Sequence, residues 1–147
     1  MSESTAVVPL ISSGTAGPLG ALHLPRLWLK LSLAANGALP EGYDECGSGF
    51  DAMTLAALGL NREKTIEFVR QNLPTYMEFE EWVVDNGKID PAAIEKHNAA
   101  VRGYHHSDEL GHEMRKASKI KKDSIKDAVT LNTIEDLDEL HRRHIRK

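Results

Sequence analysis

Apolar side chains recur along this chain at the spacing of α-helices. Residues 25–36 are apolar on almost every side, which is typical of a helix buried at the centre of a bundle. Amphipathic patterns with helical spacing follow, separated by glycine, proline and capping residues. No alternating run of β-branched residues predicts a strand. The pattern predicts an all-α fold, a compact helical bundle of five to seven helices around the buried first helix.

Capping signals place the next two helices. Ser48, with Asp51 three residues later, resembles a capping box and predicts a helix that runs through Leu58. Asn61 predicts the N-cap of the following helix, and Pro74 predicts its end.

The later helices are marked in the same way. Thr75 and Glu78 form a second capping box, at the start of a helix that ends near residue 86. Asp90, followed by a proline, predicts another start, and we expect that helix to continue to about Lys116. The last helix is expected to begin at Asn132 or the residue after it.

Composition divides the chain into three parts. Residues 1–19 are rich in Ser, Thr, Gly, Ala and Pro, and they predict a flexible N-terminal arm. Residues 20–117 contain the expected helical core domain. Residues 118–147 are expected to form a basic, helical C-terminal extension.

The overall composition is that of a soluble globular protein. Of the 147 residues, 41% are hydrophobic and 27% are charged, and the net charge is −4. The single cysteine, Cys46, excludes an internal disulfide and favours a reducing compartment. The N-terminus lacks the pattern of a signal peptide, and no apolar stretch approaches the roughly 20 residues needed to cross a bilayer. We therefore expect a cytoplasmic protein with no membrane partner.

A basic run covers residues 115–126 and has the charge needed for phosphate contacts. It contains no aromatic residue on which a base would stack, and the whole chain is acidic. These features disfavour nucleic acid as a partner and favour a solvated helical face or contact with an acidic partner.

The first candidate site lies on the apolar helix at 25–36. Arg26 and Lys30 are four residues apart and share one narrow strip, which His23 extends if the helix begins early enough. Unpaired buried charge is costly, so these cations need acids, a ligand or a water-filled cleft. Asp51 is the expected acid. One interpretation is a structural ion pair between Asp51 and Arg26 or Lys30.

The other interpretation is a cationic pocket with apolar walls for a small organic anion. Arg26 would bind the anion, and Lys30 or Tyr43 would transfer a proton. Cys46 is expected to be a small buried side chain, or a thiolate if a cation lies beside it. The predicted substrate-binding residues are Arg26, His23, Asp51, Trp28 and Cys46, and the predicted catalytic residues are Lys30, Tyr43 and His105.

The second candidate site lies on the expected helix after Asp90. His105, Asp108 and His112 are spaced by three and four residues, so a continuous helix would place them on one face. That spacing allows a divalent metal site, an acid–base cluster, or an ordinary polar helix end. No cofactor is expected if the metal alternative fails. No glycine-rich phosphate loop, zinc-protease motif or nucleophile elbow is present.

Residues 19–98 also resemble a bacterial domain family of unknown function. The matching elements are Leu19-Gly20, Leu24-Pro25-Arg26, Lys30, Gly42-Tyr43, Cys46, Asp51 and Trp82-Val83. The chain departs from the family pattern at Leu29 and Ser32, where the family has an acid and an arginine. The resemblance implies no activity. It implies that Arg26, Lys30, Tyr43, Cys46 and Asp51 form one spatial cluster.

Three functions remain open on the sequence alone. The first is a cofactor-independent enzyme of the lyase or isomerase type, which uses acid–base chemistry on a small organic anion. The second is a non-catalytic binding or interaction module with a basic tail, and the third is a metal-binding helical protein. In each case the apolar segments near both ends predict a homodimer.

Overall fold

The computed structural model describes residues 5–146, and the regular elements within that range are all helical. They are α1 (Leu24–Ala35), α2 (Phe50–Ala57), α3 (Arg62–Asn72), α4 (Tyr76–Asn86), α5 (Pro91–Gly103), α6 (Asp108–Ala117), α7 (Ala128–Leu140) and a final π-helical turn, η2 (His141–Ile145). This confirms the all-α prediction. None of the described helices combines the length and the apolar character needed to span a membrane.

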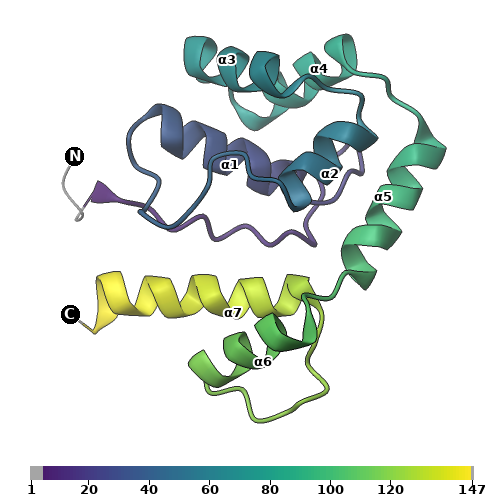
Figure 1. Cartoon of the computed structure of the whole chain (residues 1–147). Helices are drawn as coiled ribbons and strands as arrows, with labels where there is room; N and C mark the ends of the chain where they lie inside the picture. The colour runs from purple at the N-terminus through teal and green to yellow at the C-terminus, as the bar shows by residue number, and fades with distance from the viewer. Residues whose placement is uncertain (1–4, 147) are drawn as a thin grey trace.

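The core forms around α1, as its apolar pattern predicts. Leu24, Leu27 and Leu31 are at most 1% exposed and belong to the main hydrophobic cluster. Helix α1 contacts α2, α3 and α4, which cover it on the side away from α7 (Figure 1). Phe79 of α4 is fully buried in the same cluster.

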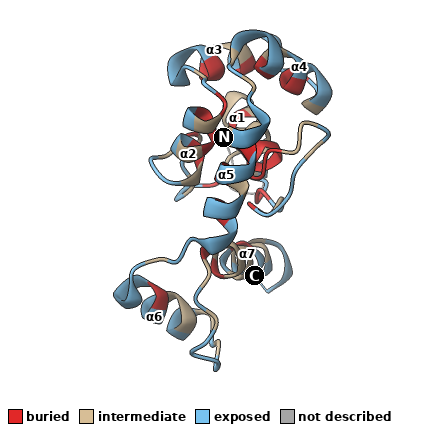
Figure 2. Cartoon of the chain, turned by 90° about the vertical axis from the view of Figure 1, so that its right-hand side faces the viewer, coloured by how far each residue is buried: buried red, intermediate tan, exposed pale blue. Residues whose placement is uncertain are grey.

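Helices α6 and α7 form a second group, which lies beyond the C-terminal end of α5 (Figure 2). Helix α7 runs beside the N-terminal segment, which lies between it and α1 in Figure 1. The approach is close, because a Cβ on Gly14 would lie 3.3 Å from the Val129 side chain of α7. The two ends of the chain therefore meet along the open side of α1.

Three of the four predicted caps are present, including that of α5, where the Asp90 side chain accepts a hydrogen bond from the Ala92 amide. The Asn61 side chain accepts a hydrogen bond from the Lys64 amide, and Thr75 with Glu78 forms the reciprocal capping box. The predicted box at residues 48 and 51 is wrong. Helix α2 begins at Phe50 with a glycine N-cap and no side-chain cap, because the carboxylate of residue 51 is engaged elsewhere.

The prediction that the fifth helix continues to residue 116 is also wrong. Helix α5 ends at Gly103, and a new helix begins at Asp108, where Ser107 caps it by accepting from the Leu110 amide. Between them, the extended Tyr104 offers its carbonyl to the amide at the start of α7. Helix α7 begins four residues earlier than expected, after its own Asp cap at 127.

The N-terminal segment was expected to be flexible, and its described part, residues 5–19, packs instead against α1. Val8 and Ser13 are each 3% exposed. The Val7 amide donates to the Ala38 carbonyl across the end of α1. Residues 1–4 of the expected arm lie outside the described residues.

Candidate functional site

His23 stands at the N-cap of α1, in a loop that α5 holds in place. Asn98 accepts from the Leu22 amide at 2.9 Å and donates to the Gly20 carbonyl at 2.7 Å. His97 donates from Nε2 to the Leu22 carbonyl at 3.0 Å. These three bonds fix the residues directly before His23 and so set the direction of its imidazole.

The backbone of His23 is left-handed, with φ 74°. A residue with a Cβ rarely adopts that conformation, which costs on the order of 1–3 kcal/mol where surrounding structure enforces it. The ring is buried, at 2% exposure, and both of its nitrogens have partners. The strained backbone thus directs one imidazole into a defined set of contacts.

The partners of His23 define its tautomer. Nε2 lies 2.5 Å from Asp51 Oδ1, and a carboxylate only accepts, so Nε2 carries the proton. Nδ1 lies 2.9 Å from Ser13 Oγ. In the neutral ring Nδ1 has a lone pair and accepts, so the Ser13 hydroxyl donates to it. The three side chains form a chain of hydrogen bonds from serine through histidine to aspartate.

Asp51 lies in the first turn of α2, where the helix dipole favours a negative charge. Besides His23, it accepts from Lys30 Nζ at 2.5 Å and from the Gly47 amide at 2.8 Å. Burial alone raises the pKa of this carboxyl. The hydrogen bond from His23 and the charge of Lys30 outweigh burial, and the net pKa lies below its ordinary value. Asp51 is therefore an anion.

Burial is also the largest influence on the pKa of His23, and it lowers it. The hydrogen bond and charge of Asp51 raise the pKa, but the nearby charges of Lys30 and Arg26 oppose them. The net pKa is below 6.5, so the imidazole is neutral at neutral pH. A neutral imidazole with a lone pair on Nδ1 is a competent general base.

Arg26 is held by a separate carboxylate, Asp136 of α7. Its guanidinium donates to both Asp136 oxygens, at 2.7 and 3.2 Å, in a bidentate pair. It also donates to the carbonyls of Pro9 and Ile11, at 2.7 and 2.9 Å. The sequence allowed Asp51 to pair with Arg26 or Lys30, and its partner is Lys30.

Tyr43 shares the carboxylate that binds Arg26. Its hydroxyl donates to Asp136 Oδ1 at 2.9 Å. Burial, and then the negative charge of Asp136, raise the pKa of Tyr43 far above its ordinary value. The phenol keeps its proton, so it can donate hydrogen bonds but does not act as a base near neutral pH.

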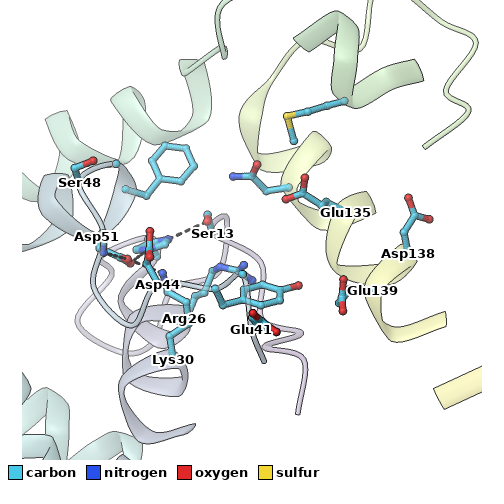
Figure 3. A pocket seen from close by; sticks show the side chains of 18 of the residues that line it. Ser13, Arg26, Lys30, Glu41, Asp44, Ser48, Asp51, Glu135, Asp138 and Glu139 are labelled. Atoms are coloured by element: carbon cyan, nitrogen blue, oxygen red, sulfur yellow. Dashed lines mark hydrogen bonds and ion pairs between the residues drawn. The ribbon is translucent and has the colours of Figure 1, made fainter. Parts of the chain in front are cut away.

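A cavity of about 690 Å³ opens beside these groups, between the α1–α2 region and α6–α7. That volume lies within the usual range for small-molecule sites. Ser13, His23, Lys30, Asp51 and Tyr43 all line it. In Figure 3, Ser13 and Asp51 lie on the α1 side of the opening, and Asp138 and Glu139 of α7 lie across from them.

The cavity is more acidic than the sequence suggested. Its lining includes the three cations Arg26, Lys30 and Arg142, and the six acids Glu41, Asp44, Asp51, Glu135, Asp138 and Glu139. Burial, with the neighbouring charge of Asp136, raises the pKa of Glu135. The walls are mixed, with polar and apolar surface in nearly equal shares, and Phe50 is the main aromatic surface beside the imidazole, 5.6 Å from it between ring centres.

Three predicted site residues lie outside the lining of this cavity. Trp28 is two residues from both cations of α1 and so faces away from them, with its indole donating to the Pro74 carbonyl at 3.0 Å. Cys46 lines an adjoining hollow with Arg62. His105 is an exposed residue in the connection between α5 and α6.

Cys46 is buried, at 5% exposure, and its thiol is free. Burial raises the pKa of this thiol, and the charge of Asp51 raises it further, so the group is protonated rather than a thiolate. Arg62 contacts the Cys46 carbonyl oxygen, at 2.9 Å. The side chain therefore packs as a small hydrophobe.

The second predicted site is not assembled. His105 lies in the connection between α5 and α6, whereas Asp108 and His112 lie on α6 and are exposed. The spacing predicted one face only because it assumed a continuous helix. Among residues 5–146, no group of three or more histidine, cysteine or acidic side chains is arranged to hold a metal ion.

The structure adds residues that the sequence did not indicate. Ser13 comes from the segment expected to be flexible, and Asp136 from the expected basic extension. The one available signal was the need of Arg26 for an acid, but nothing in the sequence pointed to an acid 110 residues away. The acids of α7 that line the cavity were missed for the same reason.

Neither the scan of protein-family models nor the search of curated proteins returned a match to this chain. The family resemblance of residues 19–98 therefore stays a prediction. The functional assignment rests on the geometry of the site.

Proposed function

We propose that this protein is a cofactor-independent enzyme that uses acid–base chemistry on a small molecule, with His23 as its general base. The observation that carries the proposal is a neutral imidazole of defined tautomer on the wall of a 690 Å³ cavity. General bases are effective when their pKa lies near the working pH and a neighbouring group orients them. Asp51 is that neighbouring group.

The roles of the other residues follow from their partners. Lys30 fixes the Asp51 carboxylate and keeps it ionised, so Lys30 is a positioning residue rather than the acid or base expected from the sequence. Tyr43 supplies a phenolic hydrogen-bond donor at the cavity wall. Arg26 is occupied by Asp136 and two carbonyls, so it joins α7 to α1 instead of binding a ligand.

Charge distribution supports a neutral or cationic substrate over the small organic anion expected from the sequence. Carboxylates outnumber cations two to one along the cavity lining. The two cations of α1 already have buried carboxylate partners. An anion entering the cavity would meet a negative field and gain no free cation on α1.

A ligand screen followed by a turnover assay tests the proposal. Neutral molecules, amines, carboxylates and phosphates are screened by thermal shift, since a ligand at a hundred times its Kd stabilises by about 2.7 kcal/mol. Each hit is then followed by NMR with native protein and with His23→Asn, a residue that tolerates the left-handed backbone. His112→Asn is the matched control on the exposed face of α6.

We expect turnover by the native protein and the His112→Asn control, and a loss of about a hundredfold or more in His23→Asn. Equal turnover by His23→Asn contradicts the role of His23. Hits without turnover, or no hits, favour the non-catalytic interaction module. The observation that favours this second function is that Arg26 and Lys30 have buried partners and thus a sufficient structural role.

A further inference from the structure

We propose that Ser13 is a nucleophile that accepts an acyl group from an ester, with His23 as its base and Asp51 as the group that orients the base. The proposal rests on the proposed function, because it uses the same imidazole and the same cavity. It adds a covalent step and a substrate class. The general-base function of His23 does not require either one.

Ser13 is held by its own loop and by the start of α1. The Thr15 amide donates to the Ser12 carbonyl at 3.1 Å, and the His23 amide donates to the Thr15 carbonyl at 3.1 Å. The Gly14 amide donates to Ser12 Oγ at 3.0 Å. This pair of turns places the Ser13 hydroxyl beside the imidazole although the two residues are ten positions apart.

The direction of the hydrogen bonds is the one a nucleophile requires. Since Nε2 of His23 donates to Asp51, Nδ1 accepts the Ser13 proton rather than donating to Oγ. A hydroxyl whose proton points at a neutral base becomes nucleophilic as that proton leaves. Serine–histidine–acid sets are recognised by this geometry and not by chain order or fold.

All three side chains line the same cavity, which separates this set from an ordinary buried network. Figure 3 labels Ser13 and Asp51, and its dashed lines mark the hydrogen bonds that each of them makes with the imidazole. Ser13 is itself only 3% exposed, and it lines this cavity.

The reaction proceeds in two steps, acylation of Ser13 and then hydrolysis of the acyl-serine. Ser13 Oγ attacks the carbonyl carbon of the ester while His23 Nδ1 takes the hydroxyl proton. The bond to the alkoxide then breaks, and the same proton passes from Nδ1 to the leaving oxygen, which gives an alcohol and an acyl-serine. Water next attacks the acyl-serine through the same base, and the carboxylic acid and the free Ser13 hydroxyl are released.

The charges that line the cavity restrict the class of ester that can bind there. The Asp51 carboxylate stabilises the imidazolium that forms in each step. Two acids of α7, Glu135 and Asp138, face the same opening and favour a neutral or positively charged ester, whereas Glu139 is already paired with Arg142 and Arg143. An ester of an amino alcohol is the chemical class that fits these acids, because its ammonium group is positively charged.

A neutral alkyl fluorophosphonate tests the covalent step on the full chain. The Ser13 oxygen would form a bond to phosphorus as fluoride leaves, and mass spectrometry of digested protein locates the adduct. We expect phosphonylation at Ser13 in native protein, none in Ser13→Ala, and a rate about a hundredfold lower in His23→Asn. Ser48→Ala is the matched control, since Ser48 lines the same cavity while the side-chain partners of His23 are Ser13 and Asp51.

The mapping on native protein decides the matter even if a variant fails to fold. No adduct at Ser13, or an adduct at another serine with Ser13 unmodified, overturns the nucleophile. A labelling rate in His23→Asn equal to that of native protein overturns the role of the base in this step. If Ser13 is unlabelled while the turnover of a screened ligand still depends on His23, the nucleophile is rejected and the general-base function stands.

Discussion

Asp51 is the residue on which the site depends most. One buried carboxylate, 3% exposed, accepts from an imidazole, an ammonium and a backbone amide. Removing it leaves Lys30 as a buried charge without its partner and releases the imidazole from its defined orientation. Both the stability of the α1–α2 contact and the chemistry of His23 therefore depend on this one side chain.

Asp51→Ala is expected to lower the free energy of unfolding by about 3–5 kcal/mol, the usual effect of breaking a buried ion pair from one side. Urea unfolding followed by circular dichroism measures it. Asp44→Ala, an exposed acid on the same cavity, is the control and should leave the stability nearly unchanged. If both variants lowered the free energy of unfolding by the same small amount, the hydrogen bonds and ion pair of Asp51 would contribute little to stability.

The pKa of His23 makes stability depend on pH. Because this pKa is lowered in the folded protein, the unfolded chain binds more protons as the pH falls below 6.5. Stability conferred by neutral His23 is thus complete above that pH and is lost as the pH falls towards the folded pKa. Asp51, whose pKa is also lowered, loses its contribution only at more acidic pH, below 3.8.

We expect the urea midpoint of native protein to fall on acidification from pH 6.5 to about pH 5, and to fall less steeply in His23→Asn. Unfolding curves at several pH values measure the two slopes. Parallel slopes would mean that His23 titrates alike in the folded and unfolded chain.

At the scale of elements, local signals were predictable and long-range partners were not. The caps at Asn61 and Thr75 depend on residues three positions apart, so the sequence alone located them. The break between α5 and α6 depends on Ser107 as a cap and on contact between Tyr104 and the start of α7. The apolar periodicity continues through that break. Ser107 is the one local signal that opposes a continuous helix, since the contact between Tyr104 and α7 is long-range.

The Arg26–Asp136 pair joins α7 to α1, and it gives a prediction at this scale. Asp136→Ala removes the acceptor of both Arg26 and the Tyr43 hydroxyl, and we expect a loss of about 3 kcal/mol or more in unfolding free energy. Asp138→Ala, on the exposed face of the same helix, is the control. A similar small loss in both variants would contradict the joining role of the pair.

For the whole molecule, the sequence correctly predicted the position of the core, but it predicted that residues 1–19 and 118–147 lie outside the core domain. The fully buried leucines of α1 follow from its apolar pattern. Residues 9 and 11 of the N-terminal segment bind Arg26 through carbonyl oxygens, which carry no sequence signal. The roles of Ser13 and Asp136 likewise arise only once the ends have folded back along α1.

The homodimer expected from the sequence stays a prediction. Apolar side chains remain exposed on both terminal segments, with Leu10 at 48%, Leu137 at 47% and Ile145 at 67%. Burying such side chains between two copies would remove them from water. Light scattering at micromolar concentration should give about twice 16.3 kDa, and a mass of 16.3 kDa would contradict the expectation.

The general-base role of His23 is tested most directly by the protonation of its ring, read from the ring ¹⁵N shifts by NMR. We expect a protonated Nε2 and an unprotonated Nδ1 at neutral pH, a pattern that persists as the pH falls below 6.5. An imidazolium at neutral pH, or the opposite tautomer with the proton on Nδ1, would contradict it.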